Sequence, residues 1–222
     1  MRKALPKVLP VLFNTEMTCA ILQGKKTVTR RVVKPQPRMV YFDGRLQSAE
    51  DEYVLVAEGD NGELIQIVPR YSVSDILYVR EAFALNYFSK EIADFYNNGN
   101  RTAYRADFDS SKIGDVVPEP KWRPSIHMPK EAARIFLRVT DVGVERLQEI
   151  TPEDVSDEGL WPYEWSEWFG SDVLTPGWKE EWAKCWDSTV KPADREKYGW
   201  DANPWVWCIH FDRCEKPEGW PV

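Results

Sequence analysis

The segment of this 222-residue chain that most strongly suggests chemistry is basic and lies near its start. Between Met17 and Phe42 the sequence has six Lys or Arg residues and no Asp or Glu, although the net charge of the chain is −7. Such a local surplus of cations predicts an anion site, and phosphate fits it best. The alternative is a solvated basic face that pairs with acidic residues elsewhere in the chain.

Within this segment, Lys26 and Thr29 could perform nucleophilic catalysis. A threonine hydroxyl is a poor nucleophile until a base removes its proton, and a lysine beside other cations can be that base. Arg31 could hold a developing oxyanion or a carbonyl oxygen. In a regular strand Lys26 and Thr29 point to opposite faces, so the pair requires a turn or bulge near Lys26. The simpler interpretation is a cation at a helix end followed by a strand-forming threonine.

The elements that must position these residues follow from the sequence pattern. Asn14 or Thr15 can cap a helix that ends at Gly24, and Thr151 can cap a second helix that starts with Pro152. A third helix is expected over 178–186, where tryptophans recur at helical spacing, and the main strands are expected over 9–13, 27–33, 75–83, 133–145 and 204–211. Strands outnumber the short helices, so the sequence predicts an α+β fold, a small twisted barrel with helices at its ends.

Four ordered blocks resemble the ASCH domain superfamily, which is related to the PUA RNA-binding barrels. The blocks are Phe13-Asn14-Thr15-Glu16-Met17 with Gly24-Lys25-Lys26-Thr27-Val28-Thr29-Arg30-Arg31, and then residues 75–81, 150–158 and 205–209. Residues 122–129 are similar to a signature of the longer phage and prophage branch. The resemblance implies one PUA-like β-barrel domain over residues 1–222, with insertions at 38–71 and 86–120. Asp43-Gly44 and Asn61-Gly62 are turn signals that predict hairpins in the first insertion.

The resemblance also implies an activity, because small bacterial members of the superfamily are amidohydrolases that remove the acetyl group from N4-acetylcytidine. By position, Lys26 would be the base, Thr29 the nucleophile and Glu158 the proton donor, and no cofactor would be needed. The expected substrate is an acylated cytidine-type nucleoside or nucleic acid. The alternative is a non-catalytic module of a phage or prophage that binds RNA or single-stranded nucleic acid. A third interpretation is a phage accessory protein that acts on a host protein.

Other candidates surround this set. Lys25, Arg30 and Arg31 are expected to contact the substrate or a nucleic acid, and Glu81 is a rival carboxylate. Trp161 could stack on a base or pack in the core. Four scattered cysteines without a CxxC pair, and only two histidines, predict no metal site and reduced thiols. The sequence has no apolar run of transmembrane length and no clear signal peptide, so a cytoplasmic protein without a membrane partner is expected.

Overall fold

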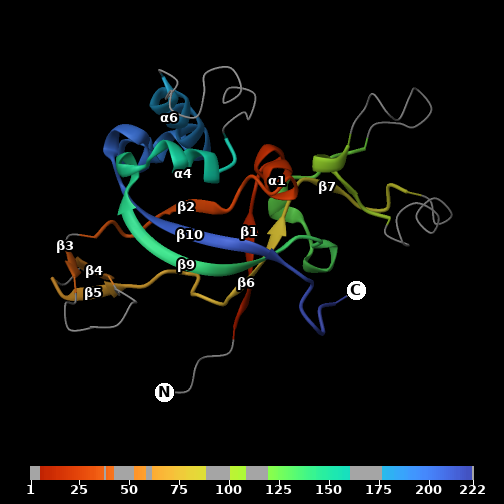
Figure 1. Cartoon of the computed structure of the whole chain (residues 1–222), viewed down its shortest axis with the longest axis horizontal. Coiled ribbons are helices and arrows are strands. Elements are labelled where there is room, and N and C mark those ends of the chain that lie inside the picture. The colour runs from red at the N-terminus through yellow and green to blue at the C-terminus, as the bar shows by residue number, and fades with distance from the viewer. Residues whose placement is uncertain are drawn as a thin grey trace. The chain divides into compact units, whose positions relative to one another are not determined.

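The computed structural model describes residues 6–37, 39–42, 53–58, 62–88, 101–108, 120–160 and 177–221 (Figure 1). These residues form a mixed α+β fold of strands with a few short helices, which confirms the predicted class. The chain divides into two compact units. The first comprises Met1–Lys26, Ser74–Arg138 and Asp212–Val222, and the second comprises Thr27–Val73 and Val139–Phe211. Two long strands, β9 (Phe136–Arg146) and β10 (Trp205–Cys214), contribute residues to both units.

In the first unit, β1 (Val8–Leu12) pairs in parallel with β6 (Ile76–Arg80), and β6 pairs antiparallel with the first residues of β9. Two shorter strands, β7 (Phe83–Ala84) and β8 (Ala103–Tyr104), form an antiparallel ribbon. The helix α1 (Thr15–Leu22) begins as the sequence predicts, because the Asn14 side chain accepts a hydrogen bond from the Met17 N–H at 2.8 Å. The unit buries an apolar cluster whose members are Phe83, Tyr104, Met128, Ala133, Phe136 and Trp220.

In the second unit, β10 lies between β9 and β2 (Val28–Val32), and β2 is antiparallel to β10. Among the described residues of this unit, the helices that accompany these strands are α4 (Pro152–Asp157), α6 (Trp178–Thr189) and α7 (Arg195–Tyr198). Thr151 caps α4 as expected, since its hydroxyl accepts from the Asp154 N–H at 3.2 Å. The core cluster comprises Leu147, Ile150, Val155, Trp182, Trp186, Val206 and Cys208, so the tryptophans at helical spacing in α6 pack inside.

The segment 38–71 contains a small antiparallel sheet of the second unit. Its strands are β3 (Met39–Phe42), β4 (Tyr53–Glu58) and β5 (Leu64–Ile67), in the order β3-β4-β5. Leu55, Ala57 and Ile67 are buried together with Val33 and Val144. The predicted hairpin between β4 and β5 is confirmed, and its apolar side chains belong to a core cluster of the unit.

Short 3-10 helices complete the described chain: Arg105–Asp107, Ser125–His127, Lys130–Ala132, Leu147–Glu149, Pro192–Asp194 and Trp200–Ala202. Of the described helices, α6 has 12 residues, and none is long and apolar enough to cross a membrane. Most of the second predicted insertion, 86–120, and the tryptophan Trp161 lie outside the described residues.

Candidate active site

The strand β2 presents its outer edge to the end of α4. Its odd-numbered residues exchange backbone hydrogen bonds with β10, as the contacts Phe211 N–H to Thr27 O and Val33 N–H to Trp205 O indicate. In an antiparallel pair the amides of the intervening residues therefore face away from the partner strand. The Arg30 N–H faces that way and donates to Glu158 Oε1 at 2.8 Å. Thr27, directly before β2, departs from this alternation: its carbonyl accepts from Phe211 of β10, but its N–H donates to the Asp157 carbonyl at 2.8 Å. The end of α4 therefore lies along this edge.

The Arg30 side chain is enclosed by three carboxylates. Its Nε donates to Glu145 at 2.7 Å, Nη2 lies 3.0 Å from Asp154, and Nη1 lies 3.4 Å from Glu158. Only 1% of this side chain is exposed. Burial by itself lowers the pKa of the guanidinium, but the surrounding acidic groups outweigh it and raise the pKa above its usual value. Arg30 is thus a buried cation that holds β2, β9 and α4 together.

Two titratable neighbours of Arg30, Asp154 and Cys208, have shifted pKa values. Burial raises the pKa of Asp154, but hydrogen bonds from Thr151 and the charge of Arg30 outweigh it, so the pKa lies below its ordinary value. Cys208 lies opposite Arg30 in the β2–β10 register, and burial raises the pKa of its thiol. A buried thiol with a raised pKa stays protonated at neutral pH and is a poor nucleophile.

Thr29 lies on the opposite face of β2 from Arg30, because successive strand residues alternate. Its side chain is buried, with the residue 1% exposed, and its hydroxyl has no hydrogen-bond partner among the described residues. Leaving a buried hydroxyl without a partner costs about 1–3 kcal/mol. The indole N–H groups of Trp122, Trp182 and Trp220 are likewise buried without a partner among the described residues, so Thr29 shares this feature with three aromatic side chains.

Glu158 is the C-terminal cap residue of α4 and is 2% exposed. The negative end of the helix dipole does not stabilise a carboxylate. The Glu158 side chain is therefore held by its contacts with other residues. One oxygen, Oε1, accepts from both the Arg30 backbone N–H and the Arg30 guanidinium. Glu158 therefore contacts the residue that follows Thr29 on β2, and both residues belong to the second unit.

Lys26 belongs to the first unit and follows the turn that ends α1. Gly24 takes the left-handed conformation with φ of 72°, as the sequence predicts, and the Lys26 N–H donates to the Ala20 carbonyl at 3.2 Å. The lysine is buried, and its ammonium lies 5.5 Å from the centre of the Phe13 ring. Its neighbour Lys25 is exposed.

Glu81, the rival carboxylate, is buried in the first unit beside Arg134. Its two oxygens accept from Nε and Nη2 of Arg134 at 2.9 and 3.1 Å. Arg134 also contacts Asp107 and lies 3.9 Å over the Tyr104 ring. Burial raises the pKa of Glu81, and Arg134 opposes that shift. This two-point ion pair fixes Glu81 in place, and no motif in the sequence pointed to its partner Arg134.

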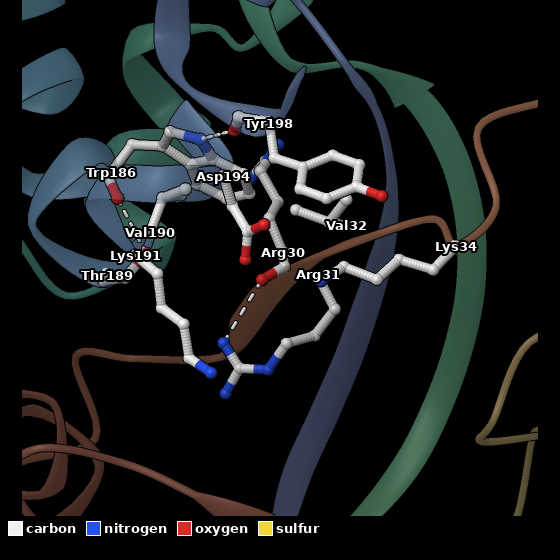
Figure 2. Close-up of a pocket in the computed structure, with 10 residues that line it drawn as sticks. All are labelled: Arg30, Arg31, Val32, Lys34, Trp186, Thr189, Val190, Lys191, Asp194 and Tyr198. Atoms are coloured by element: carbon white, nitrogen blue, oxygen red, sulfur yellow. Dashed lines mark hydrogen bonds between the residues drawn. The ribbon is translucent and has the colours of Figure 1, made fainter. Parts of the chain in front are cut away.

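A pocket of about 400 Å³ opens in the second unit beside β2. Figure 2 shows its lining, which consists of Arg30, Arg31, Val32, Lys34, Trp186, Thr189, Val190, Lys191, Asp194 and Tyr198. Arg30 and Arg31, both predicted to contact a substrate, contribute to this lining. The residues between α6 and α7 that form the other wall were not found from the sequence, because their spacing carries no recognisable motif.

The described residues contain no group of three His, Cys, Asp or Glu side chains that could hold a metal ion. Among its described residues, the second unit places the Thr29 hydroxyl, the Glu158 carboxylate and a cationic pocket along β2. The chain matches no family model, no curated protein and no solved structure.

Proposed function

We propose that the protein is an amidohydrolase-like enzyme with a PUA-like β-barrel of the ASCH type. Its substrate is an acylated cytidine-type nucleoside or nucleic acid. The observation that carries the proposal is the Thr29 hydroxyl, which is buried without a hydrogen-bond partner among the described residues. A nucleophile has to keep its hydroxyl available for a base and a substrate, and a hydroxyl without a partner among the described residues supports that role.

The reaction divides the roles among three residues. Lys26 takes the proton of the Thr29 hydroxyl while the oxygen attacks the carbonyl carbon of the acyl group. The bond from that carbon to the amine nitrogen breaks, and Glu158 delivers a proton to the departing nitrogen. Water then cleaves the ester on Thr29, which releases the carboxylic acid and restores the hydroxyl. The sum is one amide and one water converted into one acid and one amine.

The test is release of acetate by the purified protein from N4-acetylcytidine and from acetylated RNA. Thr29→Val removes the hydroxyl at nearly constant volume and should abolish release, whereas Thr29→Ser keeps a hydroxyl and should retain measurable activity. Wild-type protein that is inactive on both substrates contradicts the proposal. Equal activity of the Val and wild-type proteins would also contradict it, because another group would then be the nucleophile.

A second candidate function, a non-catalytic module that binds RNA or single-stranded nucleic acid, is favoured by the cationic pocket beside β2. Three basic residues, Arg31, Lys34 and Lys191, line it in addition to the enclosed Arg30. Binding of a short single-stranded RNA by wild-type protein that releases no acetate would select this function over the first.

A further inference from the structure

A second pocket, of about 520 Å³, lies beside the first half of α6 in the second unit. Among the described residues, its lining consists of Gln148, Lys179, Glu180, Ala183 and Trp200. None of these residues is assigned a part in acyl hydrolysis, and none lines the pocket beside β2. The volume falls within the range of small-ligand pockets, so this pocket can hold a ligand of its own.

The aromatic wall of this pocket is held in place. The Trp200 backbone N–H donates to Asp187 Oδ1 at 2.8 Å, and the half-buried Trp200 packs against the core cluster that contains Trp186. Ala183 contributes only a methyl group to the lining, so α6 leaves space in the pocket. A fixed indole with space beside it suits an apolar group. An aromatic ring gains most, because aromatic pairs gain free energy beyond the area that they bury.

Gln148 offers the pocket a fixed hydrogen-bond acceptor. Its Nε2 donates to the Trp200 carbonyl at 2.9 Å, and its backbone N–H donates to Asn203 Oδ1 at 2.9 Å. Because a carbonyl can only accept, the first bond fixes the orientation of the Gln148 amide and leaves Oε1 as its other end. No described residue donates to this oxygen, so it can accept a hydrogen bond from an amine or an ammonium of a ligand.

Two opposite charges of the lining have no ion-pair partner among the described residues. They are Lys179 and Glu180, both exposed, and the Lys179 ammonium lies 5.4 Å over the Trp178 ring. Consecutive helix residues point about 100° apart, which keeps the two side chains from pairing with each other. By contrast, Glu181 and Lys184 form an ion pair at 2.6 Å outside the pocket. The pocket thus offers one cation and one anion to a ligand.

The complement of this lining is a zwitterion with an apolar side chain. Coulomb attraction favours a ligand carboxylate at Lys179 and a ligand ammonium at Glu180, with Gln148 Oε1 accepting from the same ammonium. The remaining part of the ligand then packs against Trp200 and Ala183. A purely anionic ligand would be repelled by Glu180, and a purely cationic one by Lys179. An α-amino acid carries both charges on one carbon atom and so satisfies both residues.

We infer that this pocket binds a free α-amino acid with an aromatic side chain, through Lys179, Glu180 and Trp200. The inference goes beyond the proposed acyl hydrolysis and uses none of its residues. It holds whether or not an acyl group is removed.

The experiment is isothermal titration of the full chain with three compounds: L-phenylalanine, phenethylamine and 3-phenylpropionate. The second compound keeps the ring and the ammonium, and the third keeps the ring and the carboxylate. L-phenylalanine should bind tightest, and each of the others about tenfold more weakly, because one charge-assisted hydrogen bond is lost. Phenethylamine or 3-phenylpropionate that binds as tightly as L-phenylalanine overturns the inference, as does a titration with L-phenylalanine that shows no saturation.

Two variants assign the charges of the pocket. Glu180→Gln should weaken binding of L-phenylalanine about tenfold without weakening 3-phenylpropionate, and Lys179→Met should do the same without weakening phenethylamine. Glu181→Gln and Lys184→Met are the matched controls, because they remove the same charges outside the pocket and should leave every affinity unchanged. All four side chains are exposed, so the variants should fold, and thermal melts verify this. Equal losses of affinity in pocket and control variants contradict the inference.

Ala183→Leu tests the place of the ligand. The larger side chain fills the space beside α6 and should weaken all three compounds at least about tenfold, whereas Ala183→Ser should retain binding. Unchanged affinity in the Leu protein would put the ligand elsewhere and refute the inference. Acetate release measured on the same proteins keeps the two proposals apart, because none of these substitutions should change it.

Discussion

Glu158 accepts a hydrogen bond at 2.8 Å from the backbone N–H of Arg30, a residue 128 positions earlier in the chain. This contact supplies the edge amide of β2 with a partner and at the same time holds the carboxylate against the Arg30 guanidinium. One glutamate therefore completes a strand edge and forms part of a buried charge network. A functional role for Glu158 has to be separated experimentally from this structural one.

Replacing Glu158 by Gln should achieve that separation. The amide oxygen of Gln can still accept from the Arg30 N–H, but the side chain can no longer deliver a carboxylic proton. We expect turnover of acetylated substrate to fall at least tenfold while the Michaelis constant changes little, because proton delivery matters mainly in the transition state. Glu158→Ala is the structural comparison and should lower the free energy of unfolding by about 1–3 kcal/mol. If the Gln variant loses as much stability as the Ala variant, and its turnover falls only because less protein is folded, Glu158 has a structural role alone.

Thr29→Val should leave the protein as stable as the wild type, or more stable by about 1 kcal/mol, because a buried hydroxyl without a partner is removed. Thr18 provides the control, since it is equally buried and its hydroxyl donates to the Asn14 carbonyl at 2.8 Å. Thr18→Val should lower the free energy of unfolding by about 1 kcal/mol. Urea unfolding of the three proteins measures both effects, and a destabilised Thr29→Val protein would show that the hydroxyl has a stabilising partner.

Lys26→Met should abolish acetate release and preserve the fold, because Met retains most of the apolar stem that packs near Phe13. Lys121→Met is the control, at an exposed lysine of the same unit to which no role in binding or catalysis is assigned, and it should retain activity. The measurement is acetate release together with a thermal melt of each protein. Retained activity in the Lys26 protein would remove Lys26 as the base.

Removing Arg30 should destabilise the second unit in a pH-dependent manner. Arg30→Met leaves three carboxylates together without their cation, and losing one partner of a buried ion pair costs about 3–5 kcal/mol at neutral pH. In the wild type, the pKa of Asp154 is lower in the folded than in the unfolded chain. Its contribution to stability is therefore present at neutral pH and is lost as the pH falls below about 4.

In the Arg30→Met protein the effect of pH on stability has the opposite sign. Without the cation, the clustered carboxylates take up protons more readily in the folded than in the unfolded chain, so lowering the pH stabilises the variant. The difference in unfolding free energy between wild type and variant should shrink between pH 7 and pH 5. Urea unfolding at the two pH values measures it. A constant difference would mean that the carboxylates do not depend on Arg30 for their charge.

Leu55→Ala tests whether the small sheet of β3, β4 and β5 stabilises the second unit. Leu55 is fully buried in a cluster with Val33 and Val144, so the truncation should cost about 2–5 kcal/mol. Leu64 on β5 is 61% exposed, and Leu64→Ala should change stability by less than about 0.5 kcal/mol. Equal effects of the two variants, measured by urea unfolding, would place the small sheet outside the cooperative unit.

Local sequence determined the features that depend on residues close together in the chain. The cap residues Asn14 and Thr151 start their helices where expected, and Gly24 turns the chain after α1. A cap bonds to an amide two or three residues away, and a left-handed turn needs only a residue without a side chain, so both can be inferred from a few letters. The α+β class follows from the same local patterns, summed over the chain.

Only the tertiary structure decided the electrostatic surroundings of the site. Glu145, Asp154 and Glu158 each lie more than a hundred residues from Arg30 in sequence, and folding brings all three to one guanidinium. No local pattern can reveal which of 36 acidic residues will do so, or that Lys191 and Arg31 will line one pocket. The basic segment was evident from composition, but strand alternation sends the Arg30 and Arg31 side chains to opposite faces of β2, and three carboxylates neutralise the Arg30 guanidinium. The surroundings of each face are decided only when β2 packs against its neighbours in the folded chain.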